Sequence, residues 1–85
     1  MFFVYIIVSE NKNLRFYVGI SENIEARLKQ HNSGKTKSTK SYLPWKLFFF
    51  ETFKSRKEAR EKEKYWKSGI GKERIKEKWS CSLTG

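Results

Sequence analysis

An apolar run near the start of the chain constrains the fold more than any other feature. Residues 2–8 read FFVYIIV, so β-branched and aromatic side chains occupy both alternating positions. A strand of this composition is covered on both faces of its sheet. The run is much shorter than the roughly 20 residues that a membrane span needs. It also has no basic leader or small-residue cleavage site, so we expect it to belong to the fold and not to a signal peptide.

A second run, residues 14–20, predicts a partner strand, because only the polar turn over residues 9–13 separates it from the first. Two such runs with a short polar turn between them are typical of an antiparallel hairpin. If the hairpin is symmetric about Asn11, Tyr5 and Tyr17 lie directly opposite each other, with Cβ atoms about 5 Å apart. Two neighbouring phenols could accept or donate protons in a reaction. Tyrosine is common in strands, however, so ordinary packing is favoured on this pattern alone.

Capping residues and apolar periodicity define the rest of the chain. Ser21 is a suitable N-cap for the first helix, and Ser55 with Glu58 forms a capping box at the start of the second. Gly69 and Gly71 interrupt the helical pattern after the second helix. The predicted elements are a helix over residues 22–32, a basic loop over 35–41, a strand over 45–53, a helix from 56 to about 68 and a short helix over 72–79.

These elements predict an α+β fold in the order β-β-α-β-α-α, with helices carried on a three-stranded, mainly antiparallel sheet. The 85 residues suffice for one domain with one modest core. We expect a single domain over residues 1–85. Its core covers about residues 2–70, and a short helix and tail occupy residues 71–85.

The charge balance favours a polyanionic partner. Nineteen Lys and Arg residues against nine Asp and Glu residues give a formal net charge of +10. Nucleic acid is the leading partner for so small and basic a chain, whereas a solubility surface or an acidic protein partner remains open. The chain has one cysteine, Cys81, which excludes an intramolecular disulfide and a zinc site built on several cysteines. This usage suits a reducing cytoplasm.

Arg27 and His31 are spaced i, i+4, so both lie on one face of the first predicted helix. A guanidinium offers a rigid fork of donors to a phosphate, and an imidazole can transfer protons near neutral pH. His31 is the only histidine, which excludes a metal site with two or three histidines. The alternative is a solvated helix end, where a cation near the C-terminus is favourable.

Glu63 interrupts an apolar stripe on the second predicted helix. Ala59, Trp66 and Ile70 stand at i, i+7 and i+11, and Glu63 takes the i+4 position. An inward carboxylate is costly unless it is paired or binds a metal. Lys67, one turn further on, could pair with it. The functional alternative is Mg²⁺, which takes oxygen ligands and needs only one or two carboxylates.

These residues fit phosphodiester hydrolysis better than other chemistries. The reaction needs a cation at the phosphate, a proton acceptor for water and a donor to the developing charge. Glu63 could hold the cation, a tyrosine or His31 could accept the proton, and Arg27 could be the donor. The sequence has no Gly-rich phosphate loop, Cys-His pair or paired-carboxylate motif.

The arrangement resembles the GIY-YIG nuclease superfamily. Phe3-Val4-Tyr5 and Tyr17-Val18-Gly19 are similar to its two signature tripeptides, although the first lacks the glycine. The segments 24–34 and 44–47, Glu58-Ala59 and Glu63-Lys64 resemble the rest of its core. The likeness covers about residues 2–70. It is closest to small stand-alone bacterial members related to the N-terminal domain of the DNA-repair excinuclease C subunit.

The resemblance implies an α/β sandwich and hydrolysis with one metal ion, Mg²⁺ or Mn²⁺, held by Glu63. It implies that Arg27 steadies the phosphate and that Tyr5 is the general base or orients the water. Tyr17 matches a neighbouring family tyrosine, His31 another active-site position, and Gly19 the glycine of the second motif. Several members carry a late asparagine, whereas no asparagine follows Asn32 in this chain.

The expected function is therefore a metal-dependent endonuclease, with DNA favoured over RNA. We expect no membrane interaction, and either weak selectivity or a protein partner that supplies target specificity. The predicted nucleic-acid contacts are Lys35, Lys37, Lys40 and Lys67, with Thr36, Ser38 and Thr39 of the basic loop beside them. The first alternative is a basic nucleic-acid-binding module with weak or no activity. The second is a protein-interaction domain that uses Trp45 and Trp79 as exposed aromatics.

Overall fold

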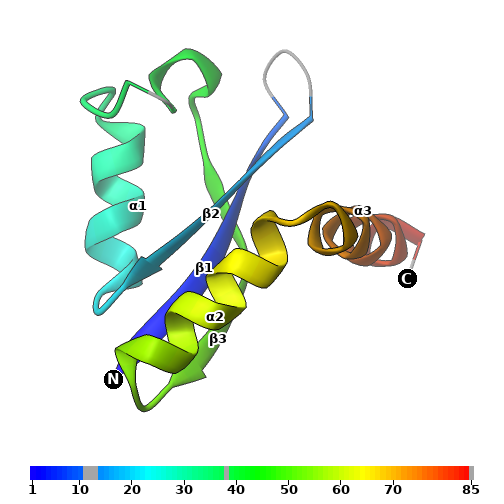
Figure 1. Ribbon diagram of the computed structural model, residues 1–85. Helices are drawn as coiled ribbons and strands as arrows, with labels where there is room; N and C mark the ends of the chain where they lie inside the picture. Colours follow the sequence, from blue (N-terminus) through cyan, green and yellow to red (C-terminus); the bar gives the residue numbers. More distant parts are fainter. Residues whose placement is uncertain (11–13, 38, 85) are drawn as a thin grey trace.

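The computed structural model describes residues 1–10, 14–37 and 39–84 and has the predicted element order (Figure 1). The α+β class and the three-stranded antiparallel sheet are both confirmed. The elements are β1 (Phe2–Ser9), β2 (Arg15–Ser21), α1 (Ile24–Asn32), a short 3₁₀ helix η1 (Lys40–Tyr42), β3 (Lys46–Phe53), α2 (Arg56–Lys67) and α3 (Gly69–Thr84).

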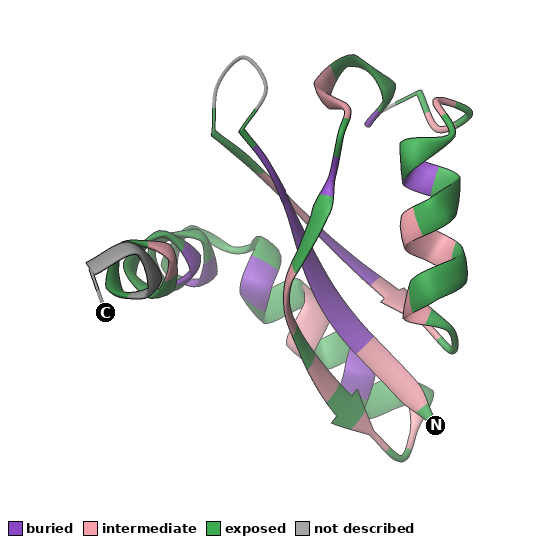
Figure 2. Cartoon of the chain, turned by 180° about the vertical axis from the view of Figure 1, so that it is seen from behind, coloured by how far each residue is buried: buried purple, intermediate pink, exposed green. Residues whose placement is uncertain are grey.

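Strand β1 is the middle strand of a sheet with the order β2-β1-β3, and it pairs antiparallel with both neighbours. Residues 4–9 of β1 are all buried, as the purple strand in Figure 2 shows. Covering on both faces was expected from the unbroken apolar run. The two edge strands are more exposed, and β3 is buried at none of its eight positions.

The register of the β1–β2 hairpin differs from the prediction by two residues. Tyr5 lies opposite Gly19, and Tyr17 lies opposite Ile7. The symmetry assumed about Asn11 is therefore wrong, and Asn11 itself lies outside the described residues. Because successive side chains alternate between faces, a shift of two residues leaves both tyrosines on the same face. Their ring centroids are 6.5 Å apart.

The sheet separates two clusters of apolar side chains. On the face that α2 crosses in Figure 1, Val4 and Ile6 pack with Trp66. On the face toward α1, Tyr5 and Ile7 form the second cluster. The first cluster consists of Val4, Ile6, Val18, Ala59, Trp66 and Ile75; the second has Tyr5, Ile7 and Trp45 at its centre, with Ile24 and Leu28 of α1 against it.

Helix α1 begins two residues later than expected because Ser21 is still part of β2. Asn23 is the N-cap, and its side chain accepts a hydrogen bond of 3.1 Å from the Ala26 amide. Ser21 instead accepts one from the Asn23 amide. The predicted end is confirmed: Ser33 is the C-cap, and Gly34 follows with φ of 81°, a conformation that favours glycine.

The junction between α2 and α3 is shorter than predicted. Ser55 caps α2 by accepting from the Glu58 amide at 3.2 Å, as expected. Only Ser68 separates the two helices, so residues 69–71 are the first turn of α3 and not a break before it. Gly71 permits this tight turn, since a Cβ there would collide with the Tyr65 carbonyl oxygen.

Helix α3 also corrects two further expectations. It runs to Thr84, beyond the predicted end at residue 79. Ile70 is 64% exposed and so is not part of the apolar stripe; the buried Ile75 packs in the core instead. No helix in the described part of the chain is both long and apolar enough to cross a membrane.

Candidate active site

The Tyr5 side chain crosses the backbone of β2 at Gly19. A Cβ placed on Gly19 would lie 2.5 Å from the Tyr5 hydroxyl oxygen and 2.6 Å from Cζ. Such distances leave no room for any side chain at this position. The glycine of the second tripeptide therefore allows the phenol of β1 to reach the edge strand of the sheet.

The Tyr5 hydroxyl meets the imidazole of His31 in the interior. The Tyr5 oxygen is 3.0 Å from His31 Nε2, and Tyr5 and His31 are 1% and 0% exposed. His31 Nδ1 is 3.1 Å from the hydroxyl of Thr39, which is also buried. Thr39 Oγ1 lies 3.4 Å from the Thr36 carbonyl, to which it can donate. With that bond made, Thr39 accepts from His31 Nδ1, and Nε2 is free to accept from Tyr5.

Burial shifts the titration of both partners in opposite directions. Burial raises the pKa of Tyr5 above 10.0, and the nearby Arg27 guanidinium only partly opposes it. Burial and then the positive charge of Arg27 lower the pKa of His31 below 6.5. At neutral pH the phenol therefore keeps its proton and the imidazole is neutral. The pair consists of a hydroxyl donor and a nitrogen acceptor.

Arg27 is half-buried and lies near enough to both members of the pair for its charge to act on them. Its Nη1 donates to the Gln30 side chain at 2.7 Å. Its Nε is buried and has no hydrogen-bond partner among the described residues. An unpartnered buried donor is costly. The guanidinium thus has a donor available for an added acceptor such as a phosphate oxygen.

Glu63 reaches the same region from α2, on the opposite side of the sheet from α1. Its carboxylate is close enough to Tyr5 to contribute to the rise of that residue's pKa. It pairs with Lys67 at 3.1 Å, and its side chain is only 22% exposed. Tyr17 and Lys67 line one cavity of about 190 Å³. Tyr5, Tyr17 and His31, with ring centroids 4.8–6.5 Å apart, thus lie together at the edge strand β2. Arg27 and Glu63 are near enough for their charges to act on Tyr5.

The donor set around this edge fits a cation that needs few protein ligands. No three His, Cys, Asp or Glu side chains cluster as a metal cage in the part of the chain that the structure describes. Glu63 alone offers a mostly buried carboxylate here. Mg²⁺ is commonly held by one or two carboxylates together with water and substrate phosphates. The residues present therefore fit such a site and do not fit an all-protein cage.

The basic loop divides into exposed and buried parts. Lys35, Lys37 and Lys40 are exposed, as a phosphate-binding role requires. Thr39 is buried against His31, so its predicted place beside them on a phosphate track is wrong. The predicted contact Ser38 lies outside the described residues.

Trp45 anchors the loop instead of forming a protein-docking surface. It is buried, and its indole Nε1 donates to the Thr39 carbonyl at 2.8 Å. Asn32 holds the Trp45 backbone from both sides, accepting from its amide at 2.6 Å and donating to its carbonyl at 3.0 Å. The expectation of an exposed Trp45 is therefore wrong. Trp79 is half-buried and packs against Phe16 and Phe48.

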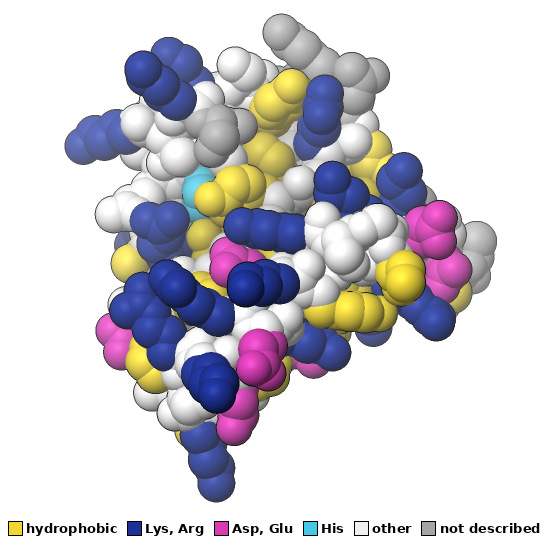
Figure 3. All heavy atoms as spheres, in the orientation of Figure 1, with side chains coloured by type: hydrophobic (Ala, Val, Ile, Leu, Met, Phe, Trp, Pro, Cys, Tyr) yellow, Lys and Arg dark blue, Asp and Glu magenta, His cyan; other side chains and the backbone are white. Residues whose placement is uncertain are grey.

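The contacts made by three residues of the site were not predicted from the sequence. Gln30 follows Arg27 at i+3, so helical spacing could have revealed its contact. Thr39 and Asn32 reach their partners through a loop whose path no local pattern predicts. Figure 3 shows the setting of the site on one face of the molecule, where Lys and Arg side chains are spread over the surface with fewer acidic ones among them.

The family follows from a comparison of the whole sequence. The profile of the GIY-YIG catalytic domain matches residues 1–76. The chain belongs to this family. The family's domains are nuclease domains, generally dependent on a divalent metal, and they imply a nucleic-acid substrate. The resemblance seen in the two tripeptides is thereby confirmed.

Small bacterial GIY-YIG proteins are similar to this one. A UPF0213 protein of Bacillus licheniformis is 44% identical over 64 residues, which cover 74% of this chain and 66% of the relative. A UPF0213 protein of Clostridium perfringens is 40% identical over 68 residues, covering 79% and 71%. The UPF0213 protein YazA of Bacillus subtilis is 35% identical over 66 residues, covering 76% and 65%. No solved structure matches the chain significantly.

Proposed function

We propose that this protein is an endonuclease that hydrolyses phosphodiester bonds with Mg²⁺ or Mn²⁺ and acts on DNA in preference to RNA. The observation that carries the proposal is the buried contact of Tyr5 with His31 beside Gly19 of β2 in a GIY-YIG domain. The charges of Arg27 and Glu63 act on the same Tyr5 hydroxyl. A basic surface around this edge suits a polyanionic substrate.

Arg27 binds the scissile phosphate. Its unpartnered Nε is a buried donor in need of an acceptor, and Arg27 forms no ion pair with a carboxylate of the described residues. A guanidinium placed at the phosphate stabilises negative charge as it develops in the transition state. Arg27→Ala should therefore lower both turnover and affinity.

Tyr5 orients the attacking water, with His31 behind it. The protonated phenol donates to His31 Nε2, which leaves its oxygen lone pairs as an acceptor for a water proton. If Tyr5 takes that proton, its own can pass to the neutral imidazole. His31 bonds the Tyr5 oxygen, which lies at Gly19 of β2, so in this proposal it acts on the reaction through Tyr5 and is a positioning residue. Tyr17, whose ring centroid is 6.5 Å from that of Tyr5, lines the small cavity beside Lys67 and is a second candidate for the water contact.

Glu63 is the proposed ligand of one metal ion. A divalent cation bound there would neutralise phosphate charge and lower the pKa of a bound water. Glu63 must exchange its ion pair with Lys67 for the metal, which frees Lys67 to contact the nucleic acid. Lys35, Lys37 and Lys40 extend the proposed phosphate path, and a protein partner would add target specificity.

The decisive experiment is a cleavage assay on labelled DNA and RNA panels that include duplex, single-stranded and branched forms. Wild type is assayed with Mg²⁺, Mn²⁺ or EDTA, beside Glu63→Gln and Arg27→Ala proteins purified identically. We expect cleavage by wild type with a metal, loss of cleavage in Glu63→Gln, and unchanged or tighter binding because a negative charge is removed. Cleavage by Glu63→Gln at the wild-type rate would refute the metal assignment.

The second candidate function is nucleic-acid binding without useful catalysis. The ion pair between Glu63 and Lys67 favours it, because the carboxylate already has a partner. Tight, salt-dependent binding by a wild-type protein that cleaves no substrate on the panel would establish this alternative. If the wild type does cleave, single-turnover cleavage over a pH series in Tyr5→Phe and His31→Ala would test whether Tyr5 and His31 orient the water.

A further inference from the structure

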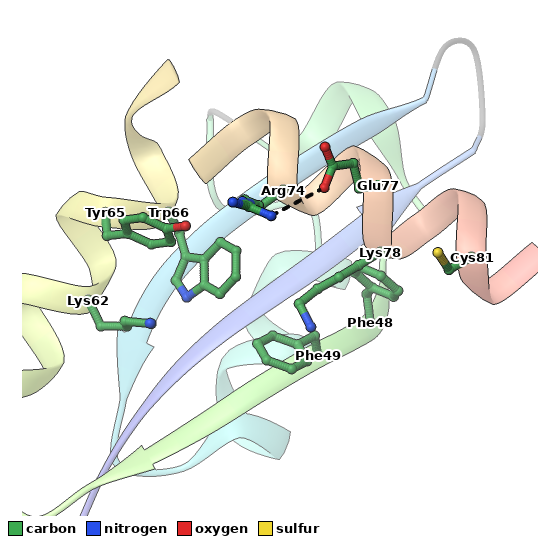
Figure 4. Close-up of a pocket in the computed structure, with 9 residues that line it drawn as sticks. All are labelled: Phe48, Phe49, Lys62, Tyr65, Trp66, Arg74, Glu77, Lys78 and Cys81. Atoms are coloured by element: carbon green, nitrogen blue, oxygen red, sulfur yellow. Dashed lines mark ion pairs between the residues drawn. The ribbon is translucent and has the colours of Figure 1, made fainter. Parts of the chain in front are cut away.

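Helix α2 also borders a groove that contains none of the candidate catalytic residues. It has a volume of about 750 Å³ and lies between β3, α2 and α3 (Figure 4). A volume in this range is typical of ligand sites. Neither the family match nor the proposed catalytic residues account for it.

Aromatic side chains make up the apolar part of the groove. Phe48 and Phe49 come from β3, and Tyr65 and Trp66 come from α2. Trp66 is held rigidly, because its indole Nε1 donates to the Glu51 carboxylate at 2.8 Å. Its ring meets Phe49 edge to face at a centroid distance of 5.7 Å. Tyr65 is 37% exposed and offers the most accessible of these rings.

Cationic side chains lie over these rings. Lys62 Nζ is 4.9 Å from the Tyr65 ring centroid and 5.4 Å from that of Trp66. Lys78 reaches from α3 over Phe49, with its Nζ 4.6 Å from the ring centroid (Figure 4). Flexible ammonium groups therefore cover π faces that a planar ligand can use. A lysine displaced from a ring remains close enough to bind an anionic group beside it.

The charge of the groove indicates an anionic occupant. Lys62, Arg74 and Lys78 line it, against a single carboxylate from Glu77, which pairs with Arg74 at 3.6 Å. π surfaces with adjacent cations match a nucleotide, which joins a planar base to a phosphate. An apolar peptide would use the rings but not the cations.

We propose that this groove binds an unpaired nucleotide of the nucleic-acid substrate, with its base on the aromatic side chains and its phosphate on the lysines. The inference rests on the proposed nucleic-acid substrate and adds the form of strand that the protein prefers. Trp66 lines both this groove and the small cavity that holds Tyr17 and Lys67. A strand seated in the groove would thus adjoin the candidate active site.

The test compares two single-stranded 12-mers with the same number of phosphates, one of thymidine and one of abasic residues. Affinities are measured by fluorescence anisotropy in EDTA, so that binding is separated from cleavage. We expect wild type to bind the thymidine 12-mer about tenfold more tightly than the abasic one. Tyr65→Leu should lose this preference, and Tyr65→Phe should keep it because the ring remains.

Charge is tested separately from stacking. Lys62→Ala should weaken binding of both 12-mers, whereas Lys57→Ala, an exposed lysine of α2 outside the groove, should weaken it less. Unfolding curves of each variant control for loss of structure. A preference that survives in Tyr65→Leu, or that is absent in wild type, would overturn the proposal.

Other occupants give different results. Sedimentation would detect self-association of the wild type. If Tyr65→Leu abolishes that self-association and no base preference is seen, the groove is an interface between copies of the chain and the proposed nucleotide site is wrong. The outcome is also separate from that of the proposed function. A base preference in a protein that cleaves nothing would support the nucleotide-binding groove and refute the proposed nuclease activity. Cleavage without a base preference would support the nuclease activity and refute the nucleotide-binding groove.

Discussion

At the scale of single residues, Gly19 controls where Tyr5 can lie. We expect Gly19→Ala to destabilise the protein by about 1–3 kcal/mol, the range for an added methyl group in a packed interior. The reason is the 2.5 Å separation between the added Cβ and the Tyr5 hydroxyl oxygen. Urea unfolding measures the loss.

The matched control is a double-mutant cycle with Tyr5. Cζ of Tyr5 lies 2.6 Å from the added Cβ, so Tyr5→Phe keeps most of the clash. Tyr5→Leu should remove it, and Gly19→Ala should then cost much less in that background. An equal cost of Gly19→Ala in all three backgrounds would contradict the direct contact.

His31 should make stability depend on pH. Its pKa is lowered in the folded state by burial and by Arg27, so the unfolded chain binds the proton more readily. The contribution of His31 to the free energy of unfolding is therefore fully present above the unfolded pKa of about 6.5 and is lost as the pH drops below it. The slope approaches about 1.4 kcal/mol per pH unit until the folded imidazole also protonates.

Chemical denaturation at pH 7.5, 6.5 and 5.5 checks this dependence. His31→Gln retains a donor and an acceptor but does not titrate, so its stability should vary less over this range. Equal pH dependence in the two proteins would mean that other groups, and not His31, cause the acid loss of stability.

At the scale of elements, the basic loop between α1 and β3 is expected to bind phosphates. Replacing Lys35, Lys37 and Lys40 by Gln should reduce the slope of log K against log salt by up to about three units, because each lysine that neutralises a phosphate releases about one counterion. Fluorescence anisotropy between 50 mM and 200 mM salt measures the slope.

A charge-matched control distinguishes the loop from general charge. Lys54→Gln, Lys57→Gln and Arg60→Gln together remove the same charge from exposed positions at and before the start of α2. We expect a smaller change of slope in that protein. Equal slopes in the two triple variants would mean that the nucleic acid follows another path.

The helices and strands also show which features of the fold depend only on residues close together in the sequence. The strand and helix positions follow from alternation, four-residue spacing and caps such as Ser55, because these interactions span only a few residues. The β1–β2 register depends on how many residues the turn absorbs, and composition does not fix that number. The N-cap of α1 is Asn23 and not Ser21, because pairing with β1 extends β2 through Ser21.

The same distinction applies to the candidate site. The sequence predicts that Arg27 and His31 lie together, because their i, i+4 spacing places both on one face of a helix. The hydrogen bond between His31 and Thr39 was not found, since it depends on the path of the loop that Asn32 and Trp45 hold. From the sequence alone, the Thr39 hydroxyl in a basic loop is predicted to contact phosphate, and only its burial in the structure excludes that role.

At the scale of the whole molecule, the site joins two layers that pack on opposite faces of the sheet. The buried Tyr5 and His31 and the half-buried Arg27 lie on the α1 face of the sheet, and the carboxylate of Glu63 belongs to α2. Helix α2 also packs against the edge strand β2, where Gly19 leaves room for Tyr5. In the proposed mechanism, catalysis therefore depends on the docking of α2 as much as on the residues themselves.

This arrangement predicts that metal binding stabilises the whole fold. A cation that binds only the folded protein adds RT ln(1 + [M]/Kd), about 1.4 kcal/mol at ten times Kd. Wild type should therefore unfold at a higher temperature as Mn²⁺ is raised, and Glu63→Gln should not respond. Glu61→Gln removes the same charge from an exposed position on the same helix and should still respond like wild type. If Glu63→Gln is stabilised as much as Glu61→Gln, the ion binds elsewhere, and the single-carboxylate site at the edge of β2 is wrong whether or not the protein cleaves nucleic acid.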